Sequence, residues 1–357
     1  MIRKLADVGT YFRLPGTVYS YTTMKSGNIN ATYHVTYRHE DKTLKSYIFQ
    51  RINTHVFKNP VEIMENIDRV TEHIRAKKTG EVALHFHHSA EGLNYMYDEG
   101  AFWRVMNYVE SETYDLSDDL SVIYETGVAF GQFQLRLSDF DGSLLHETIP
   151  DFHNTKKRLD DLFAAAERNI ADRADAVAEE LDYIRAVREV AERLSVAFAN
   201  GEYPARVTHN DTKCNNVLFD KKTKKPLVVI DLDTVMPGMS MYDFADAARF
   251  IASSTVEDEP DTHKVSFELE KFRALARGYV GTVREHITPA EIDTLVEATF
   301  AITVEIAARF LTDYLNGDTY FKILYPEHNL VRARCQIALA KSIDEKRATL
   351  EGIIKEI

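Results

Sequence analysis

Apolar residues in the N-terminal third of the chain follow patterns that are typical of β-strands. Five segments are rich in β-branched and aromatic residues and partly alternate between apolar and polar positions. They cover residues 17–24, 31–38, 45–50, 82–88 and 102–109. One amphipathic helix interrupts them: Asn59 is the expected N-cap, Pro60 takes the first helical position, and apolar residues recur every three or four positions until Gly80.

Beyond residue 110 the apolar period becomes helical. A helix is expected over residues 117–137, where Gly127, Ala129 and Gly131 indicate close contact with another helix. Residues 155–200 predict one or two further amphipathic helices.

A strong helix start occurs in "ITPAEI". Thr288 is the expected N-cap and Pro289 the first helical residue, and Glu291 completes a capping box. We expect this helix to continue to Gly317.

This change of pattern predicts an α+β protein with two lobes. The 357-residue length also suggests two domains. We expect an N-terminal β-rich lobe with an antiparallel sheet over residues 1–108, and a mainly helical lobe over residues 109–357. Within the second lobe, the runs "NVLF" and "LVVIDLD" flank a basic turn and predict a hairpin.

Composition narrows the functional classes. A net charge of −13 argues against a general nucleic-acid binder, which would carry a basic face. Cys214 and Cys335 cannot form a disulfide framework and fit a reducing compartment. Neither a signal peptide nor a long uncharged apolar segment is apparent. We therefore expect a cytoplasmic protein with no membrane partner.

Polar residues with chemical potential surround the predicted hairpin. "VTHNDTKCNNVLFD" places Asp211 and Asn216 just before the first strand, and Asp231 and Asp233 follow the second. Charges at the end of a buried strand are costly unless they are paired or bind a metal. Phosphoryl transfer needs a carboxylate that orients the attacking hydroxyl and oxygen ligands for Mg²⁺. Asp211, Asn216, Asp231 and Asp233 together therefore predict metal-assisted phosphoryl transfer.

The spacing H-x-D-x-x-x-x-N over His209, Asp211 and Asn216, with Asp231 twenty residues after Asp211, matches the protein-kinase signature in all but a few letters. In "IDLD", an I-D-x-D sequence replaces D-F-G. The chain resembles the aminoglycoside phosphotransferase and choline kinase superfamily, and more closely bacterial N-acetylhexosamine 1-kinases. The closer resemblance rests on "RVTHNDTKCNNVLFD", "IDLDTVMPG", "RFLTDYLNGDTYF" and "YPEHNLVR", with a weaker match in "GNINATY".

The resemblance implies a protein-kinase-like fold that uses ATP and Mg²⁺ to phosphorylate the anomeric O1 of an N-acetylhexosamine. Asp211 is the expected catalytic base, and Asn216 and Asp231 are the expected metal ligands. We expect His209 to support the loop structurally. Candidate substrate contacts are Asp233, Arg309 and Tyr320.

The nucleotide-binding half departs from the kinase pattern. The phosphate-binding turn offers only Gly27, with Asn28 and Asn30 as side-chain donors. Gln50 stands where kinases place a lysine, as in the related sugar 1-kinases, and Arg51 follows it. Because strand residues alternate between faces, only one of these two side chains can point into the cleft.

Adenine is expected at the end of the last strand of this lobe. The backbone there could bond the base edge, and Trp103, Met106 and Tyr108 could form apolar walls. An ordinary strand end is the alternative.

Two other functions remain open. One is a kinase of choline, homoserine or an aminoglycoside, and the other is a non-catalytic nucleotide- or sugar-binding pseudokinase. Partners other than ATP and a small sugar are not expected, and the chain is expected to be a monomer or a weak homo-oligomer.

Overall fold

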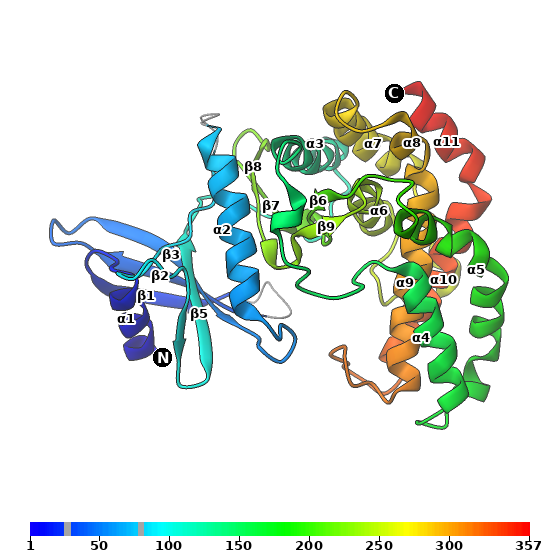
Figure 1. The fold of residues 1–357 in the computed structure, drawn as a ribbon, viewed down its shortest axis with the longest axis horizontal. Helices are drawn as coiled ribbons and strands as arrows, with labels where there is room; N and C mark the ends of the chain where they lie inside the picture. The colour runs from blue at the N-terminus through cyan, green and yellow to red at the C-terminus, as the bar shows by residue number, and fades with distance from the viewer. Residues whose placement is uncertain (25–29, 78–81) are drawn as a thin grey trace.

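The computed structural model describes residues 1–24, 30–77 and 82–357. Five antiparallel strands form one sheet in the order β1-β2-β3-β5-β4. The strands are β1 Thr17–Thr23, β2 Ala31–Arg38, β3 Leu44–Ile52, β4 Met96–Asp98 and β5 Ala101–Asn107. Figure 1 shows this sheet at one end of the molecule and the helical part at the other.

Alternation along the strands divides the sheet into two apolar faces. Trp103 and Val105 pack with helix α1 (Ile2–Tyr11), which the sequence patterns did not predict. Phe102 and Met106 point to the opposite face, which packs against α2 (Pro60–Ala76) and joins the main core. The helix predicted after Asn59 is thereby confirmed.

The strand predicted over residues 82–88 is wrong. Only Phe86 forms a bridge, to Met106, and two backbone bonds flank it: His87 N–H to Val105 O (2.9 Å) and Asn107 N–H to His85 O (3.1 Å). The edge of β5 is shared, because β4 pairs with its first residues. The segment therefore has too little of that edge left to form a continuous ladder.

The remainder is mainly helical. Its α-helices are α3 Leu120–Arg136, α4 Thr155–Arg168, α5 Ala178–Ala199, α6 Ser240–Ile251, α7 Leu269–Val283, α8 Pro289–Asp293, α9 Leu295–Leu315, α10 His328–Glu345 and α11 Arg347–Glu356. Close packing of α3 on α7 confirms the glycine prediction. A Cβ on Gly127 would lie 2.3 Å from the Leu275 carbonyl oxygen, and one on Gly278 would lie 2.1 Å from that of Tyr124.

The helix predicted from Thr288 to Gly317 is divided. The capping box of Thr288 and Glu291 is present, but α8 stops at Asp293. Thr294 Oγ1 donates to the carbonyl oxygens of Ala290 (3.0 Å) and Glu291 (3.1 Å). Such back-bonding by threonine bends a helix, and α9 begins as a separate helix at the next residue, Leu295.

Two short strand pairs lie between the sheet and the helices (Figure 1). The predicted hairpin is β7 Val217–Phe219 with β8 Pro226–Val229. A second pair joins β6 Arg206–Thr208 to β9 Met236–Gly238. Together they fix both ends of the polar loop that carries Asp211. Within the described ranges, no helix has the length and apolar character needed to cross a membrane.

Candidate active site

The polar loop between β6 and β7 is held from beneath by α6. Asp243 accepts hydrogen bonds from the backbone N–H groups of His209 and Asn210, both at 2.8 Å, and Asp246 accepts from that of Thr212 at 3.0 Å. Asn210 has a positive φ of 64°, a conformation that asparagine tolerates better than most residues. Two buried carboxylates thus fix the backbone on either side of Asp211.

His209 is a buried support for this loop, as the sequence suggested. Its ring contacts Phe130 and Phe133 edge to face. Nε2 donates to the carbonyl oxygen of Ile230 (2.8 Å), and Nδ1 accepts from the backbone N–H of Asp211 (3.3 Å). The imidazole therefore connects the loop to the end of β8.

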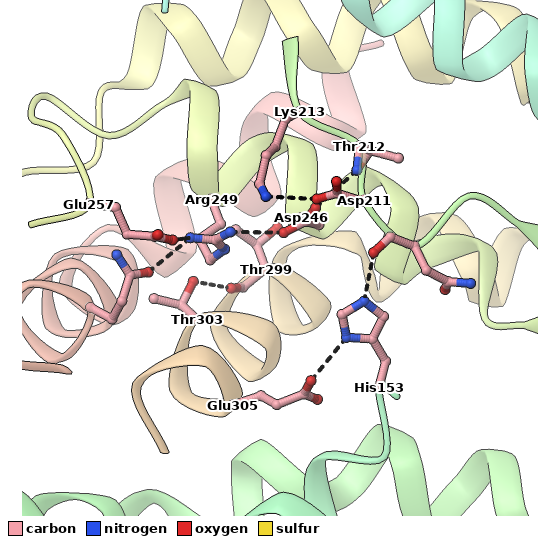
Figure 2. A network of polar contacts seen from close by, with 12 residues as sticks. His153, Asp211, Thr212, Lys213, Asp246, Arg249, Glu257, Thr299, Thr303 and Glu305 are labelled. Carbon is pink, nitrogen blue, oxygen red and sulfur yellow. Dashed lines mark hydrogen bonds and ion pairs between the residues drawn. The ribbon is translucent and has the colours of Figure 1, made fainter. Parts of the chain in front are cut away.

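Asp211 lies in a charged and partly buried setting (Figure 2). Its Oδ1 is 2.8 Å from Lys213 Nζ. Its Oδ2 accepts from Asn216 Nδ2 at 3.0 Å. Burial raises the pKa of Asp211, but the ammonium of Lys213 and the hydrogen bonds outweigh it and lower the pKa overall. The carboxylate is therefore ionised at neutral pH and fixed in orientation.

Asn216 is oriented by the same contact. Its Nδ2 also donates to the Asp211 carbonyl oxygen at 2.8 Å. Both amide hydrogens are thus occupied, and none of the described residues donates a hydrogen bond to its Oδ1. That oxygen is left as a free acceptor or metal ligand.

Asp231 lies two residues after the end of β8 and has a left-handed backbone, with φ 61° and ψ 57°. Strained positions of this kind cluster at functional sites. Asp231 is exposed, and none of the described residues forms an ion pair or a hydrogen bond with its side chain. Desolvation by the surrounding protein, followed by the negative charges of Asp233 and Asp211, raises its pKa to about 7. The local excess of negative charge favours a cation.

Asp233 is buried and paired with the sheet. Arg104 of β5 forms an ion pair with its Oδ1, and Asn30 Nδ2 donates to Oδ2 at 2.7 Å. Arg104 Nε also donates to Gln50 Oε1 at 2.8 Å. Arg104 was not among the predicted residues. The sequence signal that could have identified it is a single charged residue, Arg104, among the apolar residues of the strand "AFWRVMN".

Gln50 and Arg51 lie on opposite faces of β3, as alternation predicts. Gln50 is half-buried and Nε2 donates to Thr32 Oγ1 at 3.1 Å. Arg51 is exposed and lies opposite Trp103 in the strand register. Of the predicted phosphate-binding turn, Gly27 and Asn28 lie outside the described residues, and Asn30 is described.

Two of the three residues predicted to surround the adenine, Met106 and Tyr108, lie on the same side of the sheet. Met106 is buried on the face of the sheet that joins the main core, and Tyr108 is 38% exposed beside the His34 ring. The inclusion of Trp103 was wrong, because its side chain packs on the opposite face of the sheet with α1. Trp103 is an odd number of residues from Met106 and from Tyr108. Because side chains alternate along a strand, Trp103 points to the face opposite to theirs.

Arg309 lies on α9 with its guanidinium over two aromatic rings. It is 5.0 Å from the ring centroid of Phe152 and 5.9 Å from that of Phe321. None of the described residues forms a hydrogen bond or an ion pair with it. Tyr320 is 58% exposed, and its ring meets that of Phe321 edge to face. These side chains form one aromatic and cationic group.

A buried His153–Glu305 pair joins this group to the loop (Figure 2). His153 Nδ1 is 2.9 Å from Glu305 Oε1, and Nε2 is 3.1 Å from the carbonyl oxygen of Asn210. Because both oxygens accept, both ring nitrogens carry hydrogen. Desolvation lowers the pKa of His153, but the charge of Glu305 outweighs it and raises the pKa overall. No local sequence pattern predicts this pair, because 152 positions separate its members.

A family comparison decides how this site is classified. Residues 20–276 match the family model described as "Phosphotransferase enzyme family" (APH), which covers more than half of the chain. The chain belongs to this phosphotransferase family. The matched range of this phosphotransferase contains the Asp211 loop and both short strand pairs, and it ends inside α7.

Solved structures show the same fold. An aminoglycoside phosphotransferase from Alicyclobacillus acidocaldarius is 13% identical, with a TM-score of 0.61 over 98% of this chain and 96% of that one. Spectinomycin phosphotransferase APH(9)-Ia, solved with ADP and spectinomycin, is 12% identical, with a TM-score of 0.60 over 96% and 98%. A choline/ethanolamine kinase family protein from Mesorhizobium loti is 13% identical, with a TM-score of 0.59 over both complete chains. The phosphotransferase therefore has the predicted protein-kinase-like fold.

Proposed function

We propose that this phosphotransferase transfers the γ-phosphate of ATP to the anomeric O1 hydroxyl of an N-acetylhexosamine. Residues 1–108 form the nucleotide lobe, and residues 109–357 form the catalytic and acceptor lobe. Asp211 accepts or orients the O1 proton. Its ionised, hydrogen-bonded carboxylate supports this role, and an anomeric hydroxyl is acidic enough for a modest base.

The donor set fits a magnesium ion that is shared with a nucleotide. As far as the described residues show, Asn216 offers a free amide oxygen and Asp231 offers a carboxylate without a protein partner. Among the described residues, no group of three or more His, Cys, Asp or Glu side chains is arranged for a metal. Mg²⁺ commonly takes one or two protein oxygens and completes its shell with phosphates and water. Held by Asn216 and Asp231, such an ion would neutralise the negative charge that develops during phosphoryl transfer.

The nucleotide contacts are assigned to the five-stranded sheet and the turn before β2. Met106 and Tyr108 are proposed for the adenine. Gly27, Asn28, Asn30 and Gln50 are proposed for the phosphates. The ADP found with spectinomycin phosphotransferase supports a nucleotide site in this fold.

The positive charge of Arg309 supports a neutral sugar as the phosphate acceptor. The acids nearby are already occupied: Glu305 by His153 and Thr155, and Asp313 by three backbone N–H groups and Asn329. The open charged group is therefore a guanidinium. It would repel an ammonium acceptor, but it can donate to sugar hydroxyls or an acetamide oxygen. Phe321 and the exposed Tyr320 offer apolar ring surfaces for a sugar.

A kinase of choline, homoserine or an aminoglycoside is the second candidate. The similar folds include an aminoglycoside phosphotransferase and a choline/ethanolamine kinase family protein, so the fold does not separate the two. We favour the sugar because of the local positive charge at Arg309. A pseudokinase is disfavoured by the orientation of Asp211 and Asn216 toward one another.

Two acceptors test the proposal directly. We expect turnover of N-acetylglucosamine or an epimer with ATP and Mg²⁺, and none of its methyl glycoside, whose O1 is blocked. The product phosphorus must couple to the anomeric proton in its NMR spectrum. Equal turnover of both sugars would place the phosphate on another hydroxyl. Activity confined to choline, homoserine or an aminoglycoside would support the second candidate.

Replacing Arg309 by methionine tests the acceptor contact. We expect the KM for the hexosamine to rise about tenfold, since an unpaired polar group costs about 1–3 kcal/mol, while the KM for ATP changes little. Arg347→Met is the matched control, because Arg347 also lies over a ring of α9, that of Phe300, at 5.1 Å. An equal rise in both KM values would show that Arg309 supports the fold and does not contact the sugar.

A further inference from the structure

The sheet carries a buried cation beside the position where kinases have a lysine. Gln50 occupies that position, and Arg104 is its direct register partner on β5. The two side chains share a face of the sheet, and Arg104 Nε donates to Gln50 Oε1 at 2.8 Å. Arg51 lies on the other face and is exposed. Arg104 is therefore the cation that this sheet presents toward the hairpin.

The partner of Arg104 belongs to the other part of the chain. Arg104 is 1% exposed and Asp233 is 3% exposed, and the pair joins β5 to the turn after β8. Removing two charges from water is costly, so such a pair alone is weak support for stability. Its members are also geometrically fixed, because Gln50 binds the guanidinium and Asn30 Nδ2 binds the second carboxylate oxygen at 2.7 Å.

The same turn is held at a second point. Asn66 of α2 donates from Nδ2 to the carbonyl oxygen of Val235 at 3.1 Å. Asp231 lies two residues before Asp233 and has the left-handed backbone described above. Contacts from the sheet and α2 therefore hold the segment that presents the Asp231 carboxylate.

We propose that Arg104 is a positioning residue that replaces the missing strand lysine by an indirect route. It holds Asp233, and Asp233 fixes the turn that aims Asp231 at the metal and the nucleotide phosphates. This inference rests on the metal role proposed for Asp231. It also gives Asp233 an anchoring role instead of the substrate contact suggested by the sequence.

Arg104→Met and Asp233→Asn test this link, with Arg51→Met as the control from the adjacent, outward-facing position. Partners that orient metal ligands typically contribute about 10- to 100-fold in metal affinity or activity. We expect each of the first two variants to raise the Mg²⁺ concentration for half-maximal activity by about that factor. We expect the acceptor KM to remain within about twofold. Arg51→Met should match the parent.

Calorimetric titration of Mg²⁺ and ADP separates this inference from the proposed function, because it needs no acceptor. The two variants should weaken Mg²⁺-dependent ADP binding whichever acceptor the parent uses. The double variant should bind ADP with Mg²⁺ no more weakly than Arg104→Met does, because both substitutions break the same ion pair between Arg104 and Asp233. If Arg104→Met and Asp233→Asn show the same magnesium dependence as the parent, the inference is wrong. It is also wrong if the losses of Mg²⁺-dependent ADP binding in the two single variants multiply in the double variant. If Arg104→Met does not fold, Asp233→Asn, which keeps the side-chain shape, decides the matter.

Discussion

Asp211→Asn is expected to lower kcat by at least about 10²-fold, within the range of about 10²–10⁴ for positioned general bases. Asparagine keeps the shape of the side chain but cannot accept the proton of the attacking hydroxyl. It also leaves Lys213 without its 2.8 Å carboxylate partner. The melting temperature should change little, because the loop backbone is held by Asp243 and Asp246. Steady-state kinetics and thermal unfolding measure the two effects.

Asp220→Asn is the matched control for this change. Asp220 lies at the hairpin turn, where its carboxylate accepts from Thr223. Its substitution should leave kcat near the parent value. Retention of most activity by Asp211→Asn would remove Asp211 from the catalytic role.

Asp231→Ala is expected to abolish turnover and to remove most of the magnesium contribution to ADP binding. Asp231 is an exposed carboxylate without a protein partner in the described part of the chain, and Mg²⁺ selects such hard oxygen ligands. Loss of the side chain also relieves the repulsion by Asp211 and Asp233 that helps raise its pKa. Protein stability should therefore fall little. Calorimetry of ADP with and without Mg²⁺ measures the effect.

Asp220→Ala controls for the general loss of a carboxylate near the hairpin. It should bind ADP with Mg²⁺ as the parent does. If Asp231→Ala also binds ADP with undiminished magnesium dependence, the metal must be held elsewhere and Asp231 has a structural role.

Local patterns predicted the elements that local physics controls. The hairpin of β7 and β8 followed from two apolar runs around a basic turn, and the capping box placed the start of α8 at Thr288. The strand over 82–88 failed for a non-local reason. Its β-branched and aromatic residues fit a strand, but β4 already occupies part of the β5 edge.

The order and spacing of Asp211, Asn216 and Asp231 and the hairpin of β7 and β8 follow from the sequence alone, because neighbouring residues fix loops and hairpins. The pairing of β6 with β9 does not, because it joins segments on either side of that hairpin. Only the tertiary structure decided which distant side chains meet. Arg104 and Asp233 are 129 positions apart, and His153 and Glu305 are 152 apart. No local propensity describes such pairs. They exist because the sheet, α9 and the polar loop pack around one core, which brings buried charges within bonding distance.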